Sequence, residues 1–389
     1  MPRRKGRPTA LVGLAIATML VAAGCGSGGS TGSSAGGSGS GASAAQLKDA
    51  LSLVDASKPE PAFVAPGPKF DPSKARGKTV YAIPVSASVP FNVYVGKYLT
   101  EALSKFNIKT VYYSTTGQSS QWVAGMNTAI SQHAAAIDLI GMDPAALGPQ
   151  IAAAKAAGIP VIVDHFLDTS HKDYPGYKDV TAIVGAPYNL AGKLEAAFAI
   201  NDTKGKGTFL LVESPDLLSS TDVAVGIQAE FAKDCPSCHV VKVDVPFNDW
   251  STRMQTAVSS ALTRYSDTSY VLPVFDGMVQ YVMPAITAAG KTGTVKLASY
   301  NATPFALNYL AKRNVVTMDL GESFSWLGYA LADQTLRLMV GQPALADEKV
   351  PVRVFDASNV TATGNPPAIN TGYGNAYQAG YLTLWGLSS

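Results

Sequence analysis

The sequence predicts an α/β protein in which mainly parallel strands are covered by helices. Residues 136–165 read as one complete strand–helix–strand unit, and such a unit requires parallel strands. Apolar strand-like runs and helical patterns then alternate almost without exception from residue 79 to residue 340. The chain has 389 residues, which is more than one hydrophobic core usually serves, so we expect two lobes.

The unit at residues 136–165 also predicts a ligand-binding edge. Asp143 stands where a helix N-cap is wanted, Pro144 follows at the first helical position, and Gly158 closes the helix. Asp164 and His165 come directly after the second apolar run. Ligands bind beyond the carboxyl ends of parallel strands, so residues 141–143, Asp164 and His165 are candidate contacts. For Asp143, a pure capping role remains an equal alternative.

The rest of the chain repeats this pattern. We expect strands near residues 79–85, 108–114, 181–186, 207–214, 239–246, 270–276, 295–301 and 315–321, with helices between them and a last long helix at 324–340. No phosphate-cradling glycine loop of the GxGxxG or GxxxxGK[ST] kind is present. This excludes the common nucleotide-binding motifs, and no cofactor is expected.

The N-terminus predicts export. Four basic residues (Arg3, Arg4, Lys5, Arg7) precede an apolar stretch at 10–23, which is followed by Gly24 and Cys25. The Ala-Ala-Gly-Cys ending resembles a bacterial lipoprotein signal, which would make Cys25 the lipidated N-terminus of an extracytoplasmic protein anchored to the cell membrane. An ordinary secreted protein cut nearby is the alternative. Residues 26–77 then predict a flexible Gly/Ser tether, followed by a short helix and an extended lead-in.

Composition excludes several function classes. The 30 basic and 28 acidic residues nearly balance, and no basic face argues for nucleic acid. With four histidines, no HExxH and no GxSxG, the usual hydrolytic and metal-dependent constellations are missing, so we expect neither an enzyme nor a metal site. Cys235 and Cys238 form a CxxC between a helix and a strand pattern, which favours a structural disulfide over a redox pair.

Four segments carry a family resemblance: residues 88–103, 120–147, 153–165 and 326–342. Together with the anchor, they resemble the sugar-type (ribose-like, type I periplasmic) solute-binding proteins of ABC importers, over residues 78–341. The resemblance implies two Rossmann-like, doubly wound lobes joined by three crossovers, with the ligand trapped between them. The first lobe would comprise residues 78–185 and 319–345, and the second residues 186–318 and 346–389.

The resemblance also assigns binding positions. Phe91 matches the aromatic residue that packs against a sugar ring, and Asp164 matches an acidic binding residue. Phe275–Asp276 and Tyr300–Asn301 match polar pairs on two later strands, each with one residue changed. The family's clamping arginine would fall near Thr221–Asp222, where there is none, and its late glutamine near Asp319–Leu320. These departures argue against ribose or a close pyranose analogue.

The sequence therefore predicts a monomeric receptor that captures a sugar, polyol or similar small polar solute and delivers it to an ABC permease, with the membrane reached only through the lipid anchor. A module that senses the same solute and docks a receptor kinase or chemoreceptor is the alternative. The candidate site comprises Phe91, Asp143, Asp164, His165, Phe275, Asp276, Tyr300 and Asn301.

Overall fold

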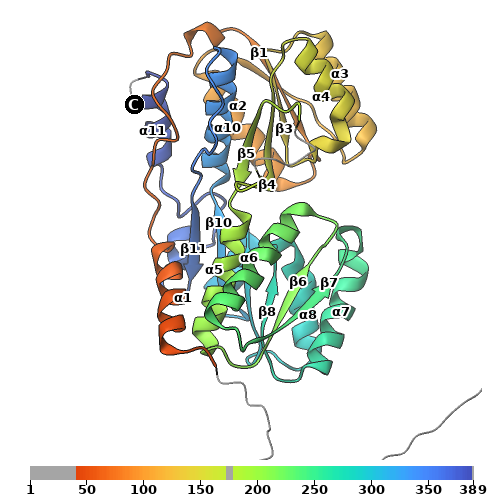
Figure 1. The fold of residues 1–389 in the computed structure, drawn as a ribbon, viewed down its shortest axis with the longest axis vertical. Coiled ribbons are helices and arrows are strands. Elements are labelled where there is room, and N and C mark those ends of the chain that lie inside the picture. The colour runs from red at the N-terminus through yellow and green to blue at the C-terminus, as the bar shows by residue number, and fades with distance from the viewer. Residues whose placement is uncertain (1–40, 172–177, 388–389) are drawn as a thin grey trace, which may run out of the picture. The chain divides into compact units, whose positions relative to one another are not determined.

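The computed structural model describes residues 41–171 and 178–387, and these residues form two β-sheets (Figure 1). The first sheet has the order β2-β1-β3-β4-β5 and is parallel throughout. Its strands are β1 (Thr79–Pro84), β2 (Lys109–Tyr112), β3 (Ala136–Ile140), β4 (Val161–Asp168) and β5 (Ala182–Ala186).

The second sheet has the order β11-β10-β9-β8-β6-β7. Its strands are β6 (Thr208–Glu213), β7 (His239–Asp244), β8 (Thr268–Pro273), β9 (Lys296–Tyr300), β10 (Val316–Glu322) and β11 (Val352–Asp356). Only the edge strand β11 is antiparallel to its neighbour within this sheet. The predicted α/β class with two doubly wound lobes is confirmed.

Helices cover both faces of the first sheet. Alternate side chains of a strand point to opposite faces. Accordingly, Val80, Ala82 and Ile162 pack with α2 (Pro90–Ser104) and α10 (Phe324–Met339). The intervening side chains pack with α3 (Ser119–Ser131) and α4 (Gly148–Ala156). We call this sheet and its helices the first lobe.

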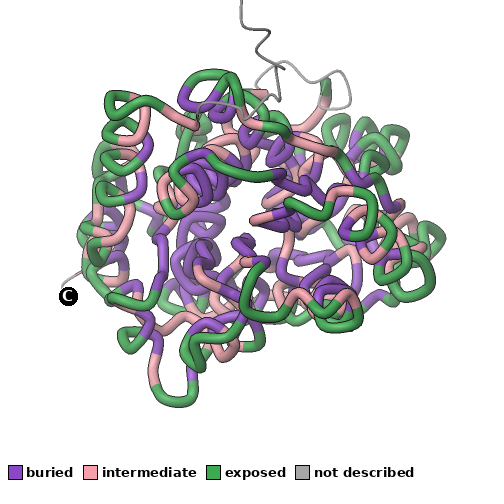
Figure 2. Tube along the Cα trace, turned by 90° about the horizontal axis from the view of Figure 1, so that it is seen from below, coloured by how far each residue is buried: buried purple, intermediate pink, exposed green. Residues whose placement is uncertain are grey.

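The second lobe is built around the second sheet. Its helices are α5 (Tyr188–Thr203), α6 (Leu218–Asp234), α7 (Trp250–Arg264), α8 (Asp276–Ala288) and α9 (Pro304–Ala311). Apolar side chains of all five helices join those of the strands in one core. Figure 2 shows the buried residues gathered inside the molecule and the exposed ones on its outer turns.

The predicted unit at residues 136–165 forms with one change at its end. Asp143 caps a short 3₁₀ turn at Pro144–Leu147, α4 follows, and Gly158 has the left-handed φ of +72° that favours glycine. The second strand does not stop at residue 163. β4 continues to Asp168, and its pairing with β5 is irregular between Asp164 and Asp168. His165 lies inside this irregular stretch with φ of +50°.

Segments outside the α/β units cover α10. Nearly every residue of this helix is buried, so each of its sides needs a partner. The Arg337 guanidinium pairs with Asp333 at 2.6 Å and donates to the carbonyl of Pro68 in the N-terminal lead-in. Asp333 also accepts from the Trp385 indole, just after α11 (Ala376–Leu384). Both chain extensions therefore pack on the first lobe.

Two expected lobe boundaries need correction. The expected boundary at residue 319 falls inside β10, which pairs within the second sheet up to Glu322. The C-terminal segment 346–389 was expected on the second lobe throughout. Its strand β11 is there, but Tyr377, Tyr381 and Trp385 pack in the first lobe's core because α10 requires cover. The lead-in also contains a packed helix, α1 (Ala44–Ala56), which contacts α5.

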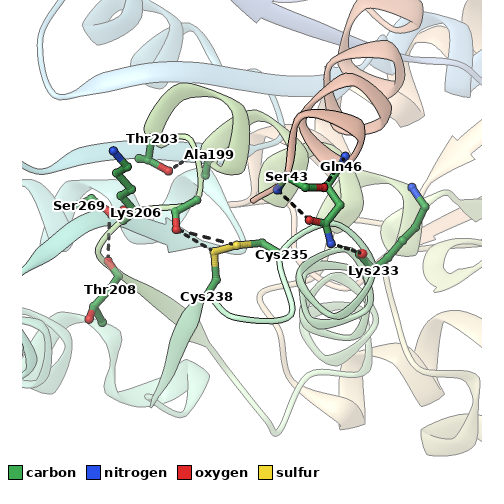
Figure 3. The surroundings of a disulfide bond; sticks show 11 residues. Ser43, Gln46, Ala199, Thr203, Lys206, Thr208, Lys233, Cys235, Cys238 and Ser269 are labelled. Carbon is green, nitrogen blue, oxygen red and sulfur yellow. Dashed lines mark hydrogen bonds between the residues drawn. A yellow bond between two sulfur atoms is a disulfide. The ribbon is translucent and has the colours of Figure 1, made fainter. Parts of the chain in front are cut away.

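Cys235 and Cys238 are joined by a disulfide in the connection from α6 to β7 (Figure 3). Cys235 is buried beside the carbonyl of Gly205. Nearby, the Gln46 side chain of α1 donates to the Lys233 carbonyl at 3.3 Å, so the N-terminal helix is tied to the same end of the second lobe.

Residues 1–40, which include the expected signal and Cys25, lie outside the described residues. Within the part of the chain that the structure does describe, no helix has both the length and the apolar character needed to cross a membrane.

Candidate ligand-binding site

Side chains from both sheets meet where the carboxyl ends of their strands come together. His165 of β4 and Glu322 at the end of β10 face each other, with the imidazole Nδ1 3.2 Å from the carboxylate Oε1. The irregular stretch of β4 places the His165 ring here. The two sheets therefore share one group of contacting residues at the edge where ligands bind to α/β folds.

Five rings form what we call the aromatic box: Phe91, His165, Tyr188, Phe275 and Tyr300. The His165 ring lies 4.1 Å from Phe91 and 5.4 Å from Tyr188, measured between centroids. Tyr188 meets Tyr300 at 5.9 Å, and Phe275 meets Tyr300 at 6.2 Å. Tyr188 also donates its hydroxyl to the His165 carbonyl at 2.9 Å. The box thus combines rings from the first lobe with rings from the second.

Glu322 forms the polar wall of the box. Its two carboxylate oxygens accept the Tyr300 hydroxyl at 2.8 and 2.7 Å. Burial raises the pKa of Glu322 to about 7, against the lowering effect of the Tyr300 hydrogen bond. Burial lowers the pKa of His165 to about 3, so its imidazole is neutral at physiological pH. The box therefore contains a carboxyl group that titrates near neutrality, beside an uncharged imidazole.

Asp164 and Asp143, both expected as ligand contacts, accept backbone hydrogen bonds at the turn after β3. Asp164 is fully buried, and its carboxylate accepts the Gly141 N–H at 3.2 Å. Burial raises its pKa well above the usual range, with Asp138 nearby adding to the effect. Asp143 accepts the Ala145 N–H at 2.8 Å, as a cap does. Both carboxylates shape the turn after β3 at the edge of the site.

Asp276 and Asn301 shape the second lobe's side of the site. Asp276 is buried and accepts hydrogen bonds from the hydroxyls of Ser299 and Thr303, at 2.8 and 2.7 Å. Burial raises its pKa to about 6. Asn301 has φ of +129°, and its backbone N–H donates to the Leu320 carbonyl. Asp276 thus fixes the loop after β9, while Asn301 is only half-buried there.

A second set of polar residues links the lobes directly. His171, which follows β4 and lies 40% exposed, has its Nε2 2.6 Å from the Asp222 carboxylate of α6. The other Asp222 oxygen accepts the Asp168 N–H at 3.3 Å, and Asp168 in turn accepts the Asn189 N–H at 2.7 Å. We call His171 and Asp222 the interlobe latch. The family resemblance placed a clamping arginine near Thr221–Asp222. In this chain the carboxylate of Asp222 lies there instead and contacts His171 of the first lobe.

Three residues of the candidate site were not predicted from the sequence: Glu322, Tyr188 and Asp222. The position of the family's late glutamine was expected near Asp319–Leu320, whereas Glu322 at the end of β10 reaches the box. The signal available was the position of Glu322 directly before the last helix. Tyr188 follows β5 in the same way that Phe91 follows β1, which would have identified it as a loop residue at the same edge.

The arrangement is suited to holding a small molecule. Aromatic faces and a few buried polar groups converge from two bodies, as in sites that enclose a ligand. Among the described residues, no group of three or more His, Cys, Asp and Glu side chains is placed to hold a metal ion.

Comparison with known proteins supports this interpretation. A family model described as a periplasmic binding protein domain matches residues 80–343. No curated protein matches the sequence. Among solved structures, an ABC transporter solute-binding protein from Mycobacterium smegmatis with bound glycerol is 17% identical; the match covers 76% of this chain and 98% of that one, with a TM-score of 0.64.

Two further solute-binding proteins of ABC transporters have the same fold. One from Bacillus halodurans with bound myo-inositol is 18% identical, over 75% of this chain and 98% of its own, with a TM-score of 0.64. One from Actinobacillus succinogenes with bound D-allose is 18% identical, over 73% of this chain and 99% of its own, with a TM-score of 0.65. Since the family model spans most of the two lobes, the chain belongs to the periplasmic binding protein family.

Proposed function

We propose that this protein is an extracytoplasmic receptor that captures a small hydroxylated solute between its lobes and delivers it to an ABC permease. The observation that carries the proposal is the aromatic box with Glu322, because each lobe supplies part of it. A solute held there contacts both lobes at once. Binding then favours the closed arrangement, which is the usual transition of two-lobed receptors.

The chemistry of the box fits hydroxylated solutes. Phe91 and Phe275 offer ring faces for the C–H surface of a sugar or polyol, and Glu322 and Asn301 offer hydrogen-bonding groups. The structural neighbours with bound glycerol, myo-inositol and D-allose support this solute class. Sites of this kind bind and orient, and we propose no catalytic step.

The test is a thermal-shift screen of sugars, polyols and cyclitols, followed by titration calorimetry of those that raise the melting temperature. Phe91→Ala is expected to weaken binding by about tenfold or more, because it removes one ring face. Leu51→Ala on the exposed side of α1 serves as the control and should bind like the wild type. If no hydroxylated solute raises the melting temperature while a peptide or lipid does, the solute class is wrong.

We further propose that Cys25 carries a lipid anchor and that the receptor acts as a monomer. The support is the sequence before Cys25 and the Gly/Ser-rich tether that follows it. In membrane fractionation, the wild type should sediment with membranes and Cys25→Ser should be released. A wild type found in the soluble fraction would refute the anchor. Recovery of the solute chemically unchanged after incubation tests the absence of catalysis.

A further inference from the structure

Four buried carboxyl groups belong to the second lobe's side of the candidate site. Glu322 lines the box, and Asp276, Asp319 and Glu195 are buried in the same lobe. Asp276 and Asp319 share a hydrogen bond, which raises the pKa of Asp319 and lowers that of Asp276, and the charge of Asp276 also raises the pKa of Glu195. Neither carboxylate oxygen of Glu195 has a hydrogen-bond partner. Four acidic groups therefore occupy an interior where ionisation is costly.

Within the described part of the chain, these four carboxyls lack a cationic partner. Across the described ranges, 41–171 and 178–387, no lysine or arginine is a hydrogen-bond or ion-pair partner of these four carboxyls. Arg353 lies in the same region and stabilises the ionised form of Tyr373. Its guanidinium, however, donates to the backbone carbonyls of Lys58 and Gly372. The imidazole of His165 is neutral. Among the described residues, none supplies a positive charge to Glu322.

The aromatic ring faces also favour a positively charged solute. A cation is attracted to the π faces of Tyr and Phe, and in a desolvated site this attraction raises affinity by a factor on the order of ten. Phe91 and Phe275, which are only half-buried, supply such faces in the box of which Glu322 is the polar wall. An anionic solute would instead meet four acidic groups without a counter-charge. A neutral solute would leave the protonation of the buried carboxyls unchanged.

We propose that the solute carries a protonated amine beside its hydroxyl groups, with the ammonium held against Glu322 and the apolar face of the solute against the rings of the box. This proposal rests on the proposed function and names its solute class: amino sugars, amino polyols and aminocyclitols. The ammonium supplies a counter-charge to ionised Glu322, and the hydroxyls are left for Asn301 and the surrounding backbone.

Proton release follows from this binding mode. Several groups face Glu322: the hydroxyl of Tyr300 from β9, His165 from β4 and Tyr373 from the C-terminal segment. An ammonium near Glu322 stabilises its ionised form and lowers its pKa below about 7. Binding near neutral pH then expels a proton. Affinity for the amine falls as the pH drops below the pKa of free Glu322, because protonated Glu322 offers no charge.

The experiment compares matched pairs in which an ammonium replaces one hydroxyl. The pairs are D-glucitol with 1-amino-1-deoxy-D-glucitol, D-glucose with D-glucosamine, and myo-inositol with an amino-deoxy-inositol. Binding is measured by calorimetry at about pH 7 in phosphate and in Tris, whose ionisation enthalpies differ. We expect the amine of at least one pair to bind about tenfold more tightly than its neutral partner, with a buffer-dependent enthalpy that shows proton release.

Variants localise the effect. Glu322→Gln should bring the ratio of amine to neutral affinity towards one. Glu230→Gln serves as the control: it changes a buried carboxyl of the same lobe that already has Lys233 at 3.9 Å, and the ratio should stay as in the wild type. If Glu322→Gln does not fold, the buffer dependence of the binding enthalpy in the wild type still tests the proposal, because that measurement needs no variant.

The outcomes separate this proposal from the one before it. If the neutral members bind as tightly as the amines or more tightly, and without proton release, the charged solute is refuted while the receptor function stands. If no member of any pair raises the melting temperature, the proposed function fails together with it.

Discussion

His165 and Glu322 stand 3.2 Å apart, although one belongs to the first sheet and the other ends a strand of the second. The contact depends on two local features. One is the irregular stretch of β4 that places the His165 ring, and the other is the end of β10 just before the chain returns to the first lobe. Any movement that separates the lobes must break this contact, so its chemistry bears on stability as well as on binding.

The first prediction concerns pH. Glu322 is protonated more readily in the folded protein, with a pKa of about 7, than in the unfolded chain near 4.5. Its contribution to stability is therefore complete below about pH 4.5 and is lost as pH rises through about 7, on the order of 3 kcal/mol in total. Because Gln does not titrate, Glu322→Gln should not show this loss. The free energy of unfolding of the wild type should therefore fall relative to that of the variant between about pH 5 and pH 8.

Chemical denaturation at a series of pH values measures this difference. Glu60→Gln, at an exposed position, is the matched control and should follow the wild-type profile. Parallel profiles for the wild type and Glu322→Gln would show that Glu322 does not titrate as proposed.

The second prediction concerns the interlobe latch. His171→Ala removes the 2.6 Å contact with Asp222, so the open arrangement should gain population. Because the His171 side chain is 40% exposed, solvent limits the effect to below about 1 kcal/mol, or at most about fivefold in the ratio of closed to open forms. Energy transfer between labels on the two lobes reports this ratio.

The control for the latch is Lys155→Ala, which breaks an ion pair with Asp179 at 2.8 Å inside the first lobe. It should leave the distance between the labels unchanged. An unchanged distance in His171→Ala as well would mean that the latch does not hold the lobes together.

The third prediction compares two arginine–aspartate pairs with the same spacing along a helix. Arg337–Asp333 is buried at 2.6 Å in α10, whereas Arg253–Asp249 is exposed at 2.9 Å in α7. Arg337→Met leaves Asp333 buried without its counter-charge and should cost about 3–5 kcal/mol of unfolding free energy. Arg253→Met should cost about 0.5 kcal/mol or less. Urea denaturation measures the loss of unfolding free energy in each variant. Equal losses in the two variants would contradict the covering of α10 by the chain extensions.

The fourth prediction concerns the disulfide. Cys235 and Cys238 precede the first residue of β7, at the amino edge of the second sheet, whereas the aromatic box is at the carboxyl edge. Replacing both with serine should cost about 2 kcal/mol of stability and leave solute affinity as in the wild type. A redox role predicts instead that one thiol of the reduced protein titrates well below the ordinary cysteine range. Thiol titration with a chromogenic disulfide decides between the two roles.

The fold was largely predictable because its signals are local. The cap at Asp143, the left-handed Gly158 and the bounds of α10 all follow from residues within a few positions of each other. The covering of α10 was not predicted, although residues 324–332 of this helix are almost all apolar, and a helix that is apolar on every side needs partners on every side. That pattern could have indicated that a further segment packs on this part of the first lobe.

The site was predictable only in part. Phe91, His165, Phe275 and Tyr300 are in the aromatic box, because residues that end parallel strands share one edge. Asp164 lies next to His165, but β4 continues past it and its side chain is buried, which the apolar run before it did not indicate. Glu322 was missed because its meeting with His165 depends on contacts between residues more than a hundred positions apart, which no local pattern records.

Hydrogen–deuterium exchange with and without the tightest-binding solute tests the central claim most directly. We predict slower exchange at both sides of the box, in residues 89–92, 164–168, 275–277 and 300–304, and at the start of α10. The hollow at the amino edge of the first sheet, lined by Lys78, His133 and Gly158, should exchange as before. Protection confined to that hollow, or to one lobe alone, would contradict a solute gripped between the two lobes.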